Sequence, residues 1–346
     1  MFRLLPTLIV CIARRAAGRN RFQYAFQQSL TERFRLCDIE SNFQCCVGVR
    51  MRKPAGGARL SFIRPLDPIQ VETPPVSDDW LHEIKYDGYR TQLILDWAGA
   101  RAFSRNGHDW SKRYWPIVAA AEKLPAESFI LDGEMIAPET DGRPNFQRMH
   151  SRMTWNAEQL AFVAFDILYI DGEDLRSLPV IERKAKLWNL VKPARDIIQY
   201  SDHVEGGGAA FFEAVERMGL EGMVSKRRES PYRSGKVDSW VKTKCWDVGD
   251  FELLGIKREP GKPAAAIMAR GGRYAGTAFI TLPSGLRERL WKRVEAAKAS
   301  KPAQRVPSAF ADDVEWVKPG ITGRVKFLRG EHTLRHATLQ DFGDGT

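Results

Sequence analysis

From residue 60 onward, short apolar runs and alternating apolar and polar positions predict a chain rich in strands. Helical spacing of apolar residues predicts helices over 113–124 and 209–219 and a short helical piece over 145–154. The proline-rich stretch 60–75 is expected to be an extended lead-in, and the glycine run 206–208 a flexible connector. The strands expected before residue 248 cover residues 80–84, 89–97, 100–104, 128–137, 161–169, 222–226 and 239–244. This first region is therefore predicted to be an α+β domain.

The pattern changes after Val248 and Gly249, where strands become short and a single helix is expected over 286–297. The strands expected here cover residues 251–256, 264–270, 274–281, 313–317 and 324–328. Five short strands with one helix are typical of an OB-fold β-barrel. We therefore predict two domains, 60–247 and 248–346, with Val248 and Gly249 as the connector and hinge between them.

Residues 1–59 do not fit either domain and are predicted to form a poorly ordered basic extension and lead-in. Residues 1–50 hold eight Arg, no Lys and three acidic residues, so half of the net charge of +10 lies there. A signal peptide, an organelle transit peptide, or a true start at Met51 would each explain this composition, and we favour the start at Met51. Four of the five cysteines also lie there, without metal-ligand spacing, which indicates free thiols in a reducing compartment. Cys245 is expected to be a packed thiol.

Composition narrows the class of protein only moderately. With 43% hydrophobic and 28% charged residues, the chain has the balance of a globular protein. No apolar run approaches the roughly 20 residues of a membrane span, so no membrane partner is expected. The net charge of +10 suits a polyanionic partner such as nucleic acid.

A lysine in an unusual position points to covalent chemistry. The stretch 80–90 reads W-L-H-E-I-K-Y-D-G-Y-R, with Lys85 between an apolar run and Asp87-Gly88. One interpretation is a strand that ends in a D-G hairpin turn. The other makes Lys85 a nucleophile, which requires neighbouring cations because a free amine is almost wholly protonated at neutral pH. Lys242 and Lys244 alternate on an expected strand, share one face, and could be those cations.

Five short motifs follow one another in a specific order: K-Y-D-G at 85–88, L-D-G-E at 131–134, F-D-I-L-Y at 165–169, E-G-M-V-S-K at 221–226 and S-W-V-K-T-K at 239–244. From about residue 60 to about residue 342 the chain resembles the ATP-dependent DNA ligases, in particular the ligase module of bacterial non-homologous end-joining ligases. The resemblance implies an α+β fold, in which a nucleotidyltransferase (adenylation) domain of antiparallel sheets with flanking helices is followed by an OB-fold β-barrel. It also implies a lysyl-AMP intermediate, an adenylylated DNA end, and sealing of nicks that carry a 5′-phosphate and a 3′-hydroxyl.

The same resemblance implies ATP as the nucleotide, Mg²⁺ or Mn²⁺ as the metal, and nicked double-stranded DNA as the partner. A role in DNA repair, recombination, replication or end joining follows, with a Ku-type end-binding protein as a candidate partner. A monomer in the cytoplasm, associated with the nucleoid, is expected. A messenger-RNA capping guanylyltransferase, an RNA ligase and a catalytically weak nucleic-acid clamp are the alternative functions.

The resemblance also assigns catalytic and phosphate-binding roles. Lys85 would attack the α-phosphorus of ATP, while Lys242 and Lys244 would contact the phosphates. Glu134 and Glu221 would be the metal ligands, with Glu134 also holding the ribose. Mg²⁺ prefers such hard oxygen ligands and needs only one or two carboxylates beside a triphosphate. Either glutamate alone would be interpreted as a surface residue.

Other positions would bind the adenosine or the DNA. Phe165 would stack on adenine, although alone it would be interpreted as a core residue. Glu83, two residues before Lys85, would accept a hydrogen bond from the adenine N6 amine and so favour ATP over GTP. Arg90 would contact the ribose, Lys226 would be structural or close to the nucleotide, and Arg105 would bind the 5′-phosphate at the nick.

One position departs from the family pattern. Ligases of this kind end their OB domain with a basic and acidic signature that orients the outgoing pyrophosphate, and here Gly343 stands where its arginine is expected. Slow self-adenylylation with near-normal sealing of pre-adenylylated nicks is therefore predicted, unless Arg335 or Arg329 takes over that role.

Overall fold

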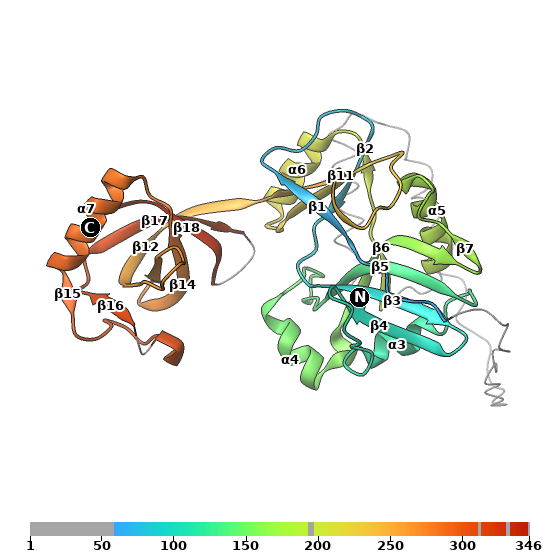
Figure 1. Cartoon of the computed structure of the whole chain (residues 1–346), viewed down its shortest axis with the longest axis horizontal. Coiled ribbons are helices and arrows are strands. Elements are labelled where there is room, and N and C mark those ends of the chain that lie inside the picture. Colours follow the sequence, from blue (N-terminus) through green and yellow to red (C-terminus); the bar gives the residue numbers. More distant parts are fainter. Residues whose placement is uncertain (1–58, 193–196, 311–312, 330–332, 345–346) are drawn as a thin grey trace, which may run out of the picture. The chain divides into compact units, whose positions relative to one another are not determined.

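The computed structural model describes residues 59–192, 197–310, 313–329 and 333–344. The prediction for residues 1–59 therefore lies almost entirely outside the described residues. The described chain forms two compact units (Figure 1). The first contains the described residues through Met218 together with Gly222–Thr243, and the second contains Gly219–Glu221 and the residues from Lys244 onward. Each unit is described by itself below.

The first unit contains a five-stranded sheet with strand order β1-β11-β10-β2-β9. Its strands are β1 (Leu66–Val71), β2 (Trp80–Ile84), β9 (Val204–Glu205), β10 (Gly222–Arg227) and β11 (Gly235–Lys244). The expected lead-in thus forms a strand, β1, which pairs in parallel with β11, whereas β2 pairs antiparallel with β10 and β9. Strands that are far apart in the sequence therefore lie side by side in this sheet.

Helix α6 (Gly208–Arg217) packs on β2 and β10 of this sheet. Gly206 and Gly207 adopt left-handed conformations at its start, with φ of +66° and +68°. A Cβ at Gly208 would lie 2.5 Å from the Pro75 carbonyl oxygen and 2.9 Å from the His82 ring. The glycine run is therefore a tight, packed entry to a helix, and the expectation of a flexible connector is wrong.

A six-stranded sheet forms the other half of the first unit, with order β4-β3-β5-β6-β7 and with β8 also paired to β6. Its strands are β3 (Tyr89–Asp96), β4 (Gly99–Ser104), β5 (Phe129–Ile136), β6 (Ala161–Ile170), β7 (Glu173–Asp174) and β8 (Ile198–Tyr200). Pairing is antiparallel except between β6 and β8. The helices of this half are α3 (Trp115–Ala121), α4 (Gln147–Trp155) and α5 (Val180–Val191), with a 3-10 turn, η2, at Ala157–Gln159.

Two apolar cores organise this unit. One lies between the six-stranded sheet and its helices and includes Leu93, Phe129, Phe162 and Leu187. The other draws residues from both sheets, so the sheets pack against each other through it. Its buried members are Leu66, Leu81, Ile94, Ile130, Leu168, Val180, Tyr232 and Trp240. Burial of such large side chains supplies the main stabilisation of the contact between the sheets.

The second unit is a closed barrel of five strands, β12-β13-β14-β18-β17, closed by pairing of β13 with β12. These strands are β12 (Trp246–Lys257), β13 (Ala265–Arg270), β14 (Arg273–Ile280), β17 (Ile321–Leu328) and β18 (Leu334–Asp344). Helix α7 (Ser284–Ala296) contributes Leu290 and Val294 to the barrel core. Strands β15 (Lys298–Ala299) and β16 (Val314–Val317) extend the sheet from β12, and a 3-10 turn, η3, covers Ser308–Phe310. The predicted fold class, an α+β domain followed by an OB-fold, is confirmed.

The structure also differs from the sequence-based prediction in its strands, in one helix and at the expected connector. The expected strand at 313–317 is β16, which lies outside the closed barrel, whereas the fifth barrel strand is β18, which was not predicted. Helix α5 was also not predicted. Val248 and Gly249 lie inside β12 and pair with Lys326 and Val325, so neither residue is in a loop connector. The strand pattern is interrupted instead at Cys245, a buried cysteine between β11 and β12 that forms no disulfide with the described residues.

Candidate active site

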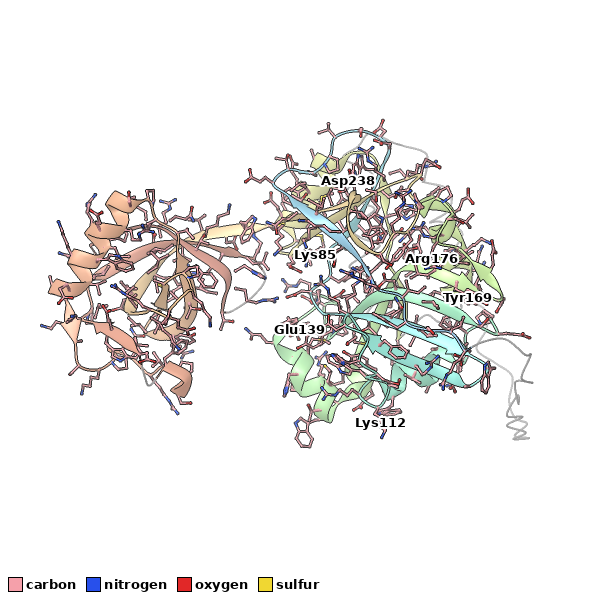
Figure 2. The ribbon with its side chains drawn as sticks, viewed as in Figure 1. Lys85, Lys112, Glu139, Tyr169, Arg176 and Asp238 are labelled. Atoms are coloured by element: carbon pink, nitrogen blue, oxygen red, sulfur yellow. The ribbon has the colours of Figure 1, made fainter. Side chains whose placement is uncertain are left out.

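Lys85 lies where the chain passes from one sheet of the first unit to the other. Strand β2 ends at Ile84 in the five-stranded sheet, and β3 begins at Tyr89 in the six-stranded sheet. The backbone N–H of Lys85 donates to the carbonyl oxygen of Gly222 at 2.9 Å, which extends the β2–β10 pairing by one residue. Because β2 and β3 do not pair with each other, a D-G hairpin turn is excluded. Figure 2 shows Lys85 at this passage.

Gly88 explains why a glycine follows Asp87 in this segment. A Cβ at Gly88 would lie 2.1 Å from the carbonyl oxygen of Met135 and 3.1 Å from Cγ of Glu134. No side chain can be accommodated that close to a backbone oxygen, so the residue must be glycine. The same contact brings the Lys85 segment against β5 beside Glu134, a half-buried residue opposite Arg90 on β3.

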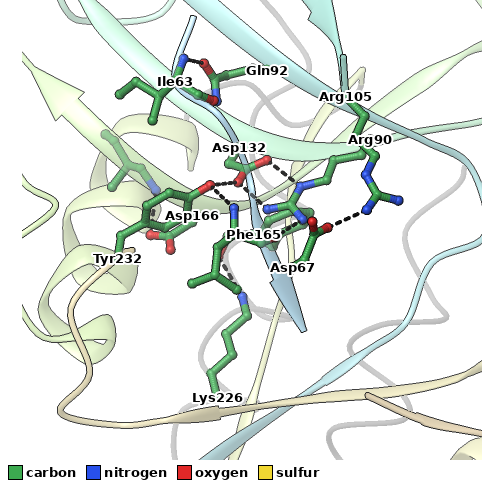
Figure 3. Close-up of polar contacts among 12 residues, drawn as sticks. Ile63, Asp67, Arg90, Gln92, Arg105, Asp132, Phe165, Asp166, Lys226 and Tyr232 are labelled. Atoms are coloured by element: carbon green, nitrogen blue, oxygen red, sulfur yellow. Dashed lines mark hydrogen bonds and ion pairs between the residues drawn. The ribbon is translucent and has the colours of Figure 1, made fainter. Parts of the chain in front are cut away.

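Arg90 is held in a buried polar network (Figure 3). Its guanidinium binds Asp132 through two hydrogen bonds, Nε to Oδ1 at 3.1 Å and Nη2 to Oδ2 at 2.7 Å, and its Nη1 donates to the carbonyl of Leu66. The Tyr232 hydroxyl donates to Asp132 at 2.7 Å and accepts from the Leu66 N–H at 3.0 Å. Burial opposes the charge on Arg90, but Asp132 outweighs it and raises the pKa of Arg90. Three nitrogens of Arg90 therefore hold β1, β3 and β5 together, and its contact with a ribose stays a prediction.

Phe165 is half-buried on β6, and two cationic side chains lie close to its ring. The guanidinium carbon of Arg90 lies 5.3 Å from the ring centroid and Nζ of Lys226 lies 4.8 Å from it. Lys226 Nζ also donates to the Phe165 carbonyl at 3.1 Å (Figure 3) and lies 4.2 Å from the Trp240 ring centroid. Trp240 contacts Phe165 edge to face, with centroids 6.1 Å apart. The structure thus brings Phe165 and Lys226 together, and their contact with adenine stays a prediction.

Glu83 is the centre of a buried charge cluster. Its Oε1 lies 2.7 Å from Nζ of Lys226 and 3.0 Å from Nζ of Lys184, and its Oε2 accepts a 2.7 Å hydrogen bond from Ser201. Burial raises the pKa of Glu83, but the two ammonium groups outweigh it and leave that pKa below its ordinary value. Burial lowers the pKa of Lys226 to about 8. With one carboxylate for two ammonium groups, the cluster carries an excess positive charge at neutral pH.

The remaining predicted residues are placed as follows. Lys242 lies on β11 opposite Gln70 of β1, and Lys244 is two residues further along the same strand. Nζ of Lys244 lies 5.7 Å from the Trp246 ring centroid. Arg105 follows β4 and forms an exposed ion pair with Asp67 at 2.5 Å (Figure 3). A phosphate at Arg105 would therefore have to displace that carboxylate.

The carboxylates that were predicted to bind metal fit Mg²⁺ by their chemistry. Glu134 is half-buried on β5, and Glu221 is buried immediately before β10. The described residues contain no cluster of three or more His, Cys, Asp and Glu side chains suited to a metal. Mg²⁺ keeps several water ligands and takes one or two carboxylates together with substrate phosphates, so such a cluster is not required.

Sequence reasoning missed several buried polar residues. Lys184 and Arg183 come from α5, Ser201 follows β8, and Asp132 and Tyr232 lie at the Arg90 network. Arg183 binds Asp166 of β6 through two hydrogen bonds, at 2.8 and 2.9 Å, and both side chains are fully buried. Asp132 and Asp166 stand inside the L-D-G-E and F-D-I-L-Y motifs, which was the available signal. Nothing comparable in sequence indicated Lys184 or Ser201.

Within the part of the chain that the structure describes, no helix is long and apolar enough to cross a membrane.

A lysine fixed between two sheets, followed by an OB-fold barrel, defines the covalent nucleotidyltransferase class. The family described as the ATP dependent DNA ligase domain matches residues 70–244. This match spans about half of the chain, and the chain therefore belongs to the ATP-dependent DNA ligase family.

Individual relatives agree with this assignment. The multifunctional non-homologous end joining protein LigD of Pseudomonas aeruginosa is 31% identical over 263 residues, covering 72% of this chain and 31% of the relative. A probable DNA ligase of Streptomyces avermitilis is 32% identical over 248 residues, covering 65% of this chain and 48% of the relative. A solved structure of mycobacterial DNA ligase D, complexed with ATP and MES, is 25% identical with a TM-score of 0.51, covering 81% of this chain and 94% of that one. The chain spans about a third of the length of the LigD proteins it matches.

Proposed function

We propose that this chain seals nicks in double-stranded DNA with ATP, joining a 5′-phosphate to a 3′-hydroxyl. The Lys85 amine attacks the α-phosphorus of ATP, a phosphoramidate bond forms, and pyrophosphate leaves. The AMP then passes to the 5′-phosphate of the nick, and the 3′-hydroxyl attacks that phosphate and releases AMP. The observation that carries the proposal is the position of Lys85, held by Gly222 and Gly88 at the passage between two sheets that both supply predicted site residues.

Residues of both sheets bind and orient the nucleotide in this proposal. Phe165 stacks on adenine, Glu83 accepts from the N6 amine, and Arg90 and Glu134 hold the ribose. Lys242 and Lys244 contact the phosphates and stabilise the charge that develops there. Lys226 keeps the adenine side of the site positively charged.

Arg105 binds the 5′-phosphate of the nick, releasing Asp67. Glu134 and Glu221 hold Mg²⁺ or Mn²⁺, which neutralises phosphate charge when bound.

The names of the relatives support a setting in DNA repair. A role in DNA repair by end joining is proposed, with a Ku-type end-binding protein as a partner. The enzyme acts as a monomer in the cytoplasm, associated with the nucleoid.

The decisive experiment is labelling with α-labelled ATP followed by denaturation, together with sealing of nicked DNA. Lys85→Ala should abolish the labelled protein while leaving binding to nicked DNA largely intact, because only the nucleophile is removed. Lys112→Ala, at an exposed lysine of the same unit, is the matched control and should behave as wild type. Label that survives denaturation in the Lys85 variant would contradict the proposal. Labelling by GTP in preference to ATP would instead indicate a capping guanylyltransferase.

Gly343 allows a separate test of the pyrophosphate step. It is exposed on β18, opposite Thr322, and a Cβ there would meet no atom within 4 Å. Gly343→Arg should therefore fold normally and increase the rate of self-adenylylation about tenfold or more, if the missing arginine limits this step. Gly343→Gln tests for an effect of size without charge. Sealing of pre-adenylylated nicks should change in neither variant, and an unchanged adenylylation rate in Gly343→Arg would show that another residue orients the pyrophosphate.

A further inference from the structure

The Glu83 carboxylate is held on three sides by protein donors. The ammonium groups of Lys226 and Lys184 share Oε1 in two ion pairs, whereas among the described residues Oε2 accepts a hydrogen bond from the Ser201 hydroxyl alone. A carboxylate oxygen offers two lone-pair sites. The Ser201 hydroxyl uses one site of Oε2, so Oε2 retains one acceptor site. Glu83 is only 2% exposed. Its side chain therefore cannot rotate into bulk water, and water cannot satisfy this acceptor site in that way.

Lys184 is the member of this cluster that ties it to the rest of the fold. Its Nζ forms an ion pair with Glu83 and also donates a hydrogen bond to the carbonyl of Ser201 at 2.5 Å. The same nitrogen lies 4.2 Å from the centroid of the Tyr200 ring. Glu83 raises the pKa of Lys184 although burial opposes this, so Lys184 is charged. The ammonium group of Lys184 therefore fixes the Glu83 carboxylate. It also fixes the backbone of Ser201, whose hydroxyl binds the other oxygen of that carboxylate.

Lys226 could not perform this task alone. Its Nζ is shared among Glu83, the Phe165 carbonyl and the Trp240 ring, so it links Glu83 to the adenine platform on β6. With Lys184 absent, nothing but the Ser201 hydroxyl would hold the far side of the carboxylate. The Glu83 side chain could then rotate toward Lys226, and Oε2 would no longer keep one orientation.

We propose that Lys184, together with Ser201, is a positioning residue that orients the free acceptor site of Glu83 toward the 6-amino group of the purine and thereby sets the preference for ATP. This inference rests on the proposed function, in which Glu83 reads the base. Lys184 itself does not touch the nucleotide. A loss of orientation should therefore affect base selection and nucleotide affinity and leave the attack by Lys85 unchanged.

The test compares ATP with purine riboside triphosphate, which lacks the 6-amino group, in self-adenylylation and in equilibrium binding. Lys184→Met should raise the KM and Kd for ATP about tenfold, with kcat within about twofold, and should leave both constants for purine riboside triphosphate nearly unchanged. Ser201→Ala removes one small hydroxyl, and should show the same pattern at a smaller size. Lys186→Met, on the same helix at an exposed ion pair with Glu173, is the matched control and should change neither nucleotide.

A Glu83→Gln background supplies the second half of the test. If Lys184 acts through Glu83, Lys184→Met should have no further effect on the ATP preference in that background. Equal losses for both nucleotides, or an undiminished effect in the Glu83→Gln background, would overturn the proposal. Absence of adenylylated wild-type protein would refute the proposed function alone, because the binding comparison still measures the role of Lys184. If Lys184→Met fails to fold, the Ser201→Ala result decides.

Discussion

Arg183 and Lys184 are neighbours on α5 and both are buried. They belong to two ion clusters that differ in their balance of positive and negative charge. Arg183 meets a single carboxylate, Asp166, through two hydrogen bonds, and donates further to the carbonyls of Leu178 and Ser230 at 2.5 and 3.2 Å. Lys184 shares one carboxylate, Glu83, with a second ammonium group. The first cluster is neutral and the second carries excess positive charge.

This difference separates a structural pair from a site prepared for a ligand. A buried charge without a counterion costs free energy of folding, whereas a balanced pair with full hydrogen bonding recovers much of that cost. The Asp166 pair joins β6, α5 and the segment near Ser230, and needs no additional ligand. The Glu83 cluster lies against Phe165, and an unbalanced, perturbed group in such a place is typical of a functional site.

The largest effect is expected from breaking the balanced pair. Arg183→Met leaves Asp166 buried without a counterion and should lower the free energy of unfolding by about 3–5 kcal/mol. Lys184→Met should cost less than half as much, because Glu83 still has Lys226 and Ser201. Urea denaturation of both variants measures the difference, and Asp166→Asn provides a second way to break the pair with little change of shape. Equal losses in the Arg183 and Lys184 variants would remove the distinction between the two clusters.

A smaller effect is expected in the pH dependence of stability. Burial depresses the pKa of Lys226 to about 8, and its ordinary value is 10.5. Between these values the unfolded chain binds a proton that the folded chain lacks, so the stability contributed by this group increases as the pH rises. The groups that also act on it are Glu83, Lys184 and Asp166.

The prediction is tested by comparing the unfolding free energy of the wild-type protein with that of a variant that lacks the Lys226 ammonium group. Relative to Lys226→Met, the wild-type protein should gain about 1–2 kcal/mol in unfolding free energy between about pH 7.5 and pH 9.5. Lys236→Met, at an exposed lysine of β11, should show no such trend relative to wild type. A difference that stays constant across this range would mean that Lys226 has an ordinary pKa.

An effect on nucleotide affinity, and not on stability, is expected at the ring beside the unbalanced cluster. Phe165→Ala removes the stacking surface but keeps the carbonyl that binds Lys226, and should raise the KM for ATP about tenfold, in the range expected for base stacking. Because Phe165 is only half-buried, the protein should remain folded. Steady-state adenylylation measures the KM, and Phe279→Ala, at an exposed ring of the barrel, is the control. An unchanged KM would place adenine elsewhere.

The sequence predicted elements well where one physical signal dominated. Strand β6 is an almost continuous apolar run, and β2, β3 and β5 each contain a shorter apolar stretch that was enough to predict a strand. Helix α5 was missed because its buried face includes Arg183 and Lys184, which interrupt the apolar spacing that identifies a helix. The partner of a buried cation lies far away in sequence, on β2 or β6, and only the folded chain brings them together.

The two errors in the second unit have a related origin. Strand β18 pairs in parallel with β14 and antiparallel with β17, so its place in the barrel depends on long-range partners. The segment 313–317 has the same local pattern but extends the sheet from β12. Val248 and Gly249 read as a break, yet pairing with β17 holds them in one long strand. Local composition cannot distinguish a strand inside a closed barrel from one beside it.

The two sheets of the first unit differ in when their strands emerge during synthesis. Strands β3 to β8 follow one another along the chain, so the six-stranded sheet has all its parts once Tyr200 has been made. The five-stranded sheet combines β1 and β2 with β9, β10 and β11, and cannot be completed before Lys244 is made. Domains generally fold as the ribosome delivers them, and distant pairings are slow to form. Within the first unit the surroundings of Lys85 are therefore completed last, and we expect a nascent chain to acquire its nucleophile site only after the six-stranded sheet on one side of it has formed.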